Sequence, residues 1–136
     1  MRKKIHLPET HTRSLSSALI VVEKSLLELE DMLTKKADSC CNLLIKDIDD
    51  KTMANNIESI REAKKYIGEM AEKYGTTAEK TSLERVIKAK RAKIWEVLTD
   101  TLSGKIKGYG KLPKKYVAEY DADINKLIEL TNRINS

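Results

Sequence analysis

Few side chains in this sequence are suited to catalysis or metal binding. The histidines are His6 and His11, and the cysteines are the adjacent pair Cys40 and Cys41. Four such residues are enough for a zinc site. Neighbouring residues on a helix point about 100° apart, however, so the two thiols are poorly placed to share one ion. Di-iron bundles need Glu-x-x-His motifs, and the sequence contains none. We therefore predict no metal and no cofactor.

The same residues offer little for nucleophilic catalysis. A cysteine–histidine pair needs a third group that orients the histidine, and none stands out near His6 or His11. We predict that the protein is not an enzyme. Adjacent thiols that are exposed and acidic can sense redox state, although packed thiols are commoner. A thiol redox or metal sensor at Cys40 and Cys41 is therefore a second alternative function.

A glycine-rich stretch, residues 104–111, has some features of a phosphate-binding loop. The glycine spacing differs from that of a P-loop, Leu112 follows Lys111 where serine or threonine is required, and no strand precedes the stretch. We interpret it as a solvated, basic loop between helices, whose lysines are able to hold an anion.

The surplus of positive charge lies in one part of the chain. Residues 76–116 contain 11 basic and 4 acidic residues, a net charge of +7, whereas the whole chain carries +5. Such a segment attracts acidic protein surfaces or phosphate backbones. Aromatic side chains for base stacking are sparse, and Trp95 is expected in the core. The candidate binding residues are Arg85, Lys88, Arg91, Lys105, Lys107, Tyr109, Lys111, Lys114 and Lys115.

The elements that position these residues are amphipathic helices. In the first, apolar residues recur at spacings of three and four from Leu15 to Leu33, which is the pattern of a helix packed along near-parallel neighbours. A second apolar stripe runs from Met53 to Tyr74. Ile48 and Ile57 are about half a turn out of phase, so one straight helix cannot carry both stripes.

The sequence allows two positions for the break between these helices. We favour a break near residues 36–39, with residues 40–49 capping the end of a bundle. The alternative is a helix that continues to Ile48 and breaks near residues 49–52. In that case its overhang would expose Leu43, Leu44, Ile45 and Ile48 as a surface for homodimerisation.

Turn residues mark the later boundaries. Gly75 suits the end of the second helix, and Thr76 with Glu79 has the spacing of a capping box for the third. The third helix is expected to end at residues 103–104, and Pro113 suits the start of the fourth. Asp121 is placed to interrupt that last helix by capping a new one.

Together these patterns predict an all-α protein, an antiparallel up-and-down four-helix bundle with a kinked or broken segment around residues 36–52. Its length fits one domain over residues 1–136, of which residues 1–12 form a flexible N-terminal tail. No disulfide framework and no apolar run of membrane-spanning length is evident, so we expect a cytoplasmic protein. The leading function is a non-enzymatic protein-interaction or regulatory module that uses a helix face or its basic loop, and an acidic protein is a candidate partner. The alternative is binding of nucleic acid or a phosphorylated ligand through residues 85–115.

Overall fold

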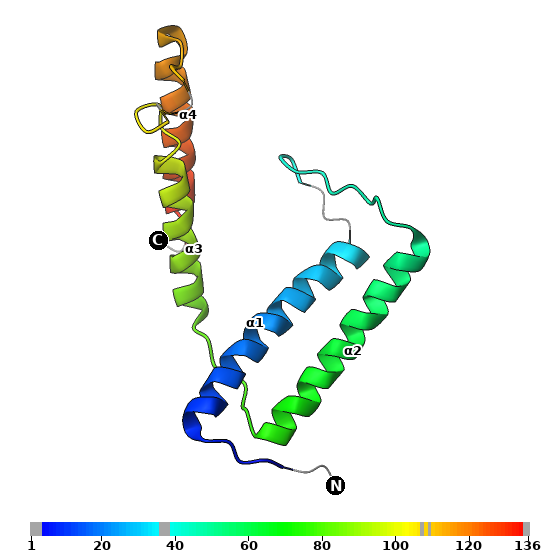
Figure 1. Ribbon diagram of the computed structural model, residues 1–136. Coiled ribbons are helices and arrows are strands. Elements are labelled where there is room, and N and C mark those ends of the chain that lie inside the picture. Colours follow the sequence, from blue (N-terminus) through cyan, green and yellow to red (C-terminus); the bar gives the residue numbers. More distant parts are fainter. Residues whose placement is uncertain (1–3, 36–38, 107, 109, 135–136) are drawn as a thin grey trace. The chain divides into compact units, whose positions relative to one another are not determined.

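The computed structural model contains four helices, packed in pairs (Figure 1). It describes residues 4–35, 39–106, 108 and 110–134, and no strand occurs among them. Helix α1 (Glu9–Thr34) packs against α2 (Asp50–Tyr74), and α3 (Leu83–Thr99) packs against α4 (Lys114–Asn132). The all-α class with four helices is confirmed. The chain divides into two compact units, residues 1–78 and residues 79–136, and a single bundle domain stays a prediction.

Helix α1 begins earlier than the sequence pattern indicated. It starts at Glu9, so four residues that we assigned to a flexible tail are helical. Pro8 precedes the helix with φ −54°, close to the value that proline fixes and that a helix requires. Arg13 then donates a hydrogen bond to Glu9 at 2.7 Å across one turn. Before the helix, the amide of Ile5 donates to the carbonyl of Lys73 at 2.8 Å.

Helix α1 ends just before the break that we favoured near residues 36–39. α1 ends at Thr34, and residues 39–49 are not helical, so a helix continuing to Ile48 is wrong, and with it the helical overhang. Residues 36–38 lie outside the described part of the chain. The side chain of Asp49 accepts a hydrogen bond from the amide of Thr52 at 2.7 Å and so starts α2 as a new helix.

Residues 40–49 do not bury their apolar side chains, contrary to our expectation of a cap on the bundle end. Leu43 is 71% exposed and Ile45 is 79% exposed. The segment contains no helix or strand, so it has no amphipathic face that could pack across the end of a bundle.

The start of α3 corrects the predicted capping box. Gly75 ends α2 in the left-handed conformation with φ 68°, as predicted, but the next amide, that of Thr76, donates to the carbonyl of Ala71 at 3.0 Å. This Schellman arrangement commits Thr76 to the end of α2. Helix α3 begins only at Leu83, where the hydroxyl of Ser82 accepts from the amide of Arg85 at 3.3 Å.

The α3–α4 connection is held by a carboxylate in the middle of a helix. Asp121 does not interrupt α4, which runs unbroken from Lys114. Its two oxygens instead accept from the amide and the hydroxyl of Ser103, at 2.9 Å and 2.6 Å. Tyr120 donates its hydroxyl to the carbonyl of Thr101 at 2.6 Å. Two consecutive residues of α4 thus fix the turns that follow α3, which ends at Thr99 and not at the predicted residues 103–104.

The core of the described structure is small. Only Ile60 and Ile67, both on α2, are buried. Glu30 of α1 bridges to α2 through Lys64 at 2.9 Å and Arg61 at 3.6 Å. Many large apolar side chains stay exposed on all four helices, so each helix pair keeps apolar surface free for further contacts.

Within the described ranges, no helix is both long enough and apolar enough to cross a membrane.

Candidate functional site

The predicted basic segment divides into two groups at opposite ends of the α3–α4 unit. Lys88 and Arg91 lie on the first half of α3, beside the last turn of α4. Lys111 and Lys114 lie at the connection between the helices. From Lys88 to the end of α3 is about 17 Å along the helix axis. The candidate residues therefore do not form one continuous patch.

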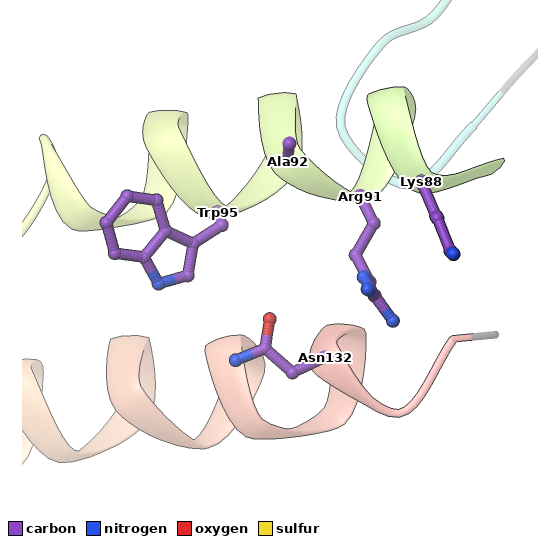
Figure 2. A pocket seen from close by; sticks show the side chains of 5 residues that line it. All are labelled: Lys88, Arg91, Ala92, Trp95 and Asn132. Atoms are coloured by element: carbon purple, nitrogen blue, oxygen red, sulfur yellow. The ribbon is translucent and has the colours of Figure 1, made fainter. Parts of the chain in front are cut away.

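The first group lines a pocket between the two helices, which we call the Lys88–Trp95 pocket. Its volume is about 250 Å³, and Lys88, Arg91, Ala92 and Trp95 of α3 line it together with Asn132 of α4. The α3 residues recur at three and four positions, so they share one face of the helix. Figure 2 shows the side chains of Lys88 and Arg91 directed toward α4, the ring of Trp95 between the two helices, and the amide of Asn132 directed toward Trp95.

The two cations of this pocket are held by bonds of different kinds. The guanidinium of Arg91 donates to the carbonyl oxygen of Ile134 at 2.7 Å. A guanidinium carries five N–H donors, so this bond leaves donors for an acidic ligand. The ammonium of Lys88 lies 3.2 Å from the carboxylate of Glu84, one turn earlier. Both side chains of that ion pair are more than half exposed, so the pair is weak and easily exchanged for another partner.

Trp95 is not a core residue, contrary to our expectation. Its side chain is 50% exposed, although it lies between the two helices. Lys88 and Arg91 precede it by seven and four residues, and this spacing places the indole and both cations on one face. This spacing is visible in the sequence, but we did not use it because we assigned the lone tryptophan to the core.

The second group surrounds a larger pocket at the α3–α4 connection. Its volume is about 480 Å³, and Lys111 and Lys114 line it with residues of the connection and Val117 of α4. Lys105 is exposed nearby in sequence. The ammonium of Lys115 lies 5.0 Å from the centre of the Tyr116 ring. Two predicted residues, Lys107 and Tyr109, lie outside the described residues.

The remaining candidates are not brought into either pocket. Arg85 is exposed on the first turn of α3. Cys40 and Cys41 are free, exposed thiols in the non-helical segment before α2. In the described part of the chain, no three histidine, cysteine or acidic side chains gather as a group able to hold a metal ion.

The carboxyl groups with clearly shifted pKa values lie outside both pockets. The hydrogen bond from Lys64 lowers the pKa of Glu30. The hydrogen bond from the amide of Thr52 lowers the pKa of Asp49, and the hydroxyl of Ser103 lowers that of Asp121. Each of these bonds joins or begins a helix, so the three carboxylates have structural roles.

Comparisons with known protein families, with curated proteins and with solved structures found no match. We therefore describe the class of this protein from its own fold and site. It is an all-α protein whose basic α3–α4 unit has an open pocket with two cations, an indole and an amide.

Proposed function

We propose that this protein is a non-enzymatic interaction module that binds an acidic segment of a partner protein in the Lys88–Trp95 pocket. A carboxylate of the partner pairs with Lys88 and Arg91, and an apolar side chain beside it packs on the exposed face of Trp95. Desolvated tryptophan and arginine side chains carry most of the binding energy in many protein interfaces.

The observation that supports this proposal is the half-exposed Trp95 beside two cations in one pocket. The size of the pocket favours a side chain over a whole small molecule, because ligand sites usually measure about 300–1,000 Å³. The charge distribution agrees with an acidic partner. Residues 79–136 carry 13 basic and 8 acidic residues, a net charge of +5, while residues 1–78 carry 13 of each.

The test is a titration with a fluorescein-labelled peptide of alternating glutamate and leucine, with a glutamine–leucine peptide as the control ligand. Trp95 is the only tryptophan, so its emission reports contact at the pocket directly. Lys88→Glu should weaken binding about tenfold or more, because it reverses one of the two charges that meet the carboxylate. Lys93→Glu is the matched control, since it changes the charge of the same helix equally but lies outside the pocket.

Equal weakening by both substitutions would show that only net charge matters and would refute the pocket. Binding of the glutamine–leucine peptide with the same affinity would refute the acidic partner.

The alternative function is binding of nucleic acid or another phosphorylated ligand through both basic groups. The concentration of the whole net charge on residues 79–136 favours it. A single-stranded oligonucleotide should then lose affinity steeply with salt, and Lys111→Glu with Lys114→Glu should flatten that slope. The unchanged affinity of this double variant would exclude the alternative.

A second alternative is a thiol redox or metal sensor at Cys40 and Cys41, which is favoured by their exposure. A response to oxidant that survives replacement of both thiols by serine would exclude the redox sensor, and unchanged zinc binding by that variant would exclude the metal sensor. We also propose a cytoplasmic location, where free thiols persist.

A further inference from the structure

One side of the α1–α2 unit carries no charged side chain over most of its length. On α1, five residues from Ala18 to Met32 recur at spacings of four and three, and on α2 five residues from Asn56 to Met70 do the same. None is charged, and none is buried. We call this surface the neutral side; it consists of Ala18, Val22, Ser25, Leu29 and Met32 of α1, and Asn56, Ser59, Ala63, Tyr66 and Met70 of α2.

Helix geometry places both stripes on the same side of the unit. Leu19 of α1 lines a pocket together with Ile67 of α2, so it marks the side of α1 that faces α2. At about 100° per residue, the α1 stripe lies about 60–140° counter-clockwise of Leu19, when the helix is viewed from its N-terminus. The α2 stripe lies about 40–120° counter-clockwise of the buried Ile60, seen in the same way. Two antiparallel helices that face each other are related by a twofold rotation, so equal rotations in the same sense reach one common side.

The contacts of the unit confirm this assignment from the other side. By the same geometry Glu30, Arg61 and Lys64 lie clockwise of the facing residues, and these three form the ion pairs between α1 and α2. Glu23 and Ser16 line a pocket of this unit and lie clockwise as well. The charged residues that bridge the helices are therefore opposite the neutral side.

The neutral side exposes large apolar side chains. Val22 is 47%, Leu29 48%, Met32 45% and Tyr66 60% exposed. Small residues lie between them at Ala18, Ser25, Ser59 and Ala63. An alternation of large and small side chains at heptad spacing allows knobs-into-holes packing against other helices.

We infer that the neutral side binds the neutral side of a second copy of this chain, so that the α1–α2 units of two copies form a four-helix interface. Its size suits a weak dimer. The two stripes, residues 18–32 and 56–70, each extend about 22 Å, and two helices side by side are about 20 Å wide. The resulting face of about 440 Å² on each copy buries about 880 Å² in total, which lies in the range of weak complexes below about 1,200 Å².

The charge of the unit also favours a second copy. Residues 1–78 carry 13 basic and 13 acidic residues, so two of these units meet without net repulsion. A strongly charged partner would find no complementary charge on the neutral side. The surface differs from the predicted overhang at residues 40–49, which is not helical.

The test is the mass of the full chain by sedimentation equilibrium, with a matched pair of substitutions. One chain has a mass of 15.5 kDa, so the dimer should measure about 31 kDa. Leu29→Glu should raise the dimer dissociation constant about tenfold or more, because it places a charge in an apolar interface. Leu27→Glu should leave it unchanged, since Leu27 is 45% exposed on the same helix but lies on the opposite side.

A second pair keeps the test decisive if Leu29→Glu fails to fold. Ser25→Glu adds a charge to the neutral side without removing an apolar group, and Ser17→Glu adds the same charge away from it. Circular dichroism checks the helix content of each variant. A mass of 15.5 kDa for the parent protein overturns the inference, because the neutral side then does not bind a second copy, whether or not another segment or another protein covers it. A dimer that folded Ser25→Glu leaves intact overturns the inference as well. Peptide binding at the Lys88–Trp95 pocket is measured separately, so either proposal can fail alone.

Discussion

Replacing Ile67 by alanine tests whether α1 and α2 are held together by the small core on α2. Ile67 is 9% exposed, and alanine removes three of its carbon atoms. At about 0.8 kcal/mol for each buried carbon, the loss is about 2 kcal/mol. The pocket beside Ile67 measures about 170 Å³ and is already open to solvent. Alanine therefore enlarges an open space instead of creating a sealed cavity, and the loss stays near the low end of the usual 2–5 kcal/mol range.

The measurement is urea denaturation followed by circular dichroism, which gives the free energy of unfolding. Ile45→Ala is the matched control, because the same atoms are removed from a side chain that is 79% exposed. Its expected loss is about 0.5 kcal/mol. If the two variants lose the same free energy of unfolding, Ile67 does not pack between the helices and the reasoning is refuted.

Three further predictions concern single bonds and single glycines. The hydrogen bond from Lys64 lowers the pKa of Glu30. The stability that this bond contributes is therefore complete above the pKa of the unfolded carboxyl group and is lost as pH falls through the lower pKa of the folded state. Glu30→Gln should flatten the acid side of a plot of urea midpoint against pH. Gly68→Ala should raise the free energy of unfolding by about 0.5–1 kcal/mol, because an added Cβ meets nothing within 4 Å, whereas Gly75→Ala should lower it by about 1–2 kcal/mol because its φ is 68°. Asp121→Ala should speed hydrogen exchange of the amide that donates to it.

Each of these predictions has an outcome that contradicts it. A pH profile of the Glu30 variant identical to that of the parent would show that the ion pair adds no stability. Equal effects of alanine at both glycines would remove the argument from backbone conformation. Exchange that is unchanged without the Asp121 carboxylate would mean that the turn after α3 holds itself.

Much of the helical organisation could be predicted from sequence because it depends on local chemistry. The spacing of apolar residues predicted four helices, and Gly75 and Pro113 marked two boundaries correctly. The phase slip between Ile48 and Ile57 required two separate helices, and α1 ends before it. Local signals failed where two of them competed, as at Thr76, whose amide completes the end of α2, so that Ser82 starts α3 instead.

The candidate site could be predicted only in part. The clustering of positive charge along the sequence indicated Lys88, Arg91, Lys111 and Lys114, because a basic residue can be identified without knowing its neighbours in space. Charge could not show that these residues form two groups at opposite ends of one helix pair. That division follows from the length of α3, which separates Lys88 from the connection by about 17 Å. The packing of the helices added that the last turn of α4 lies beside Lys88 and Arg91.

The sequence by itself determined the helical periods, the positions of some helix ends and the uneven charge, because propensity, capping and charge act within a few residues along the chain. Only the tertiary structure decided which residues of different helices meet. It brought Asn132 beside Trp95, it tied Ser103 to Asp121 across the connection, and it left Trp95 exposed instead of buried. These contacts depend on the register between neighbouring helices, and that register is set by side-chain packing over distances that no local pattern records.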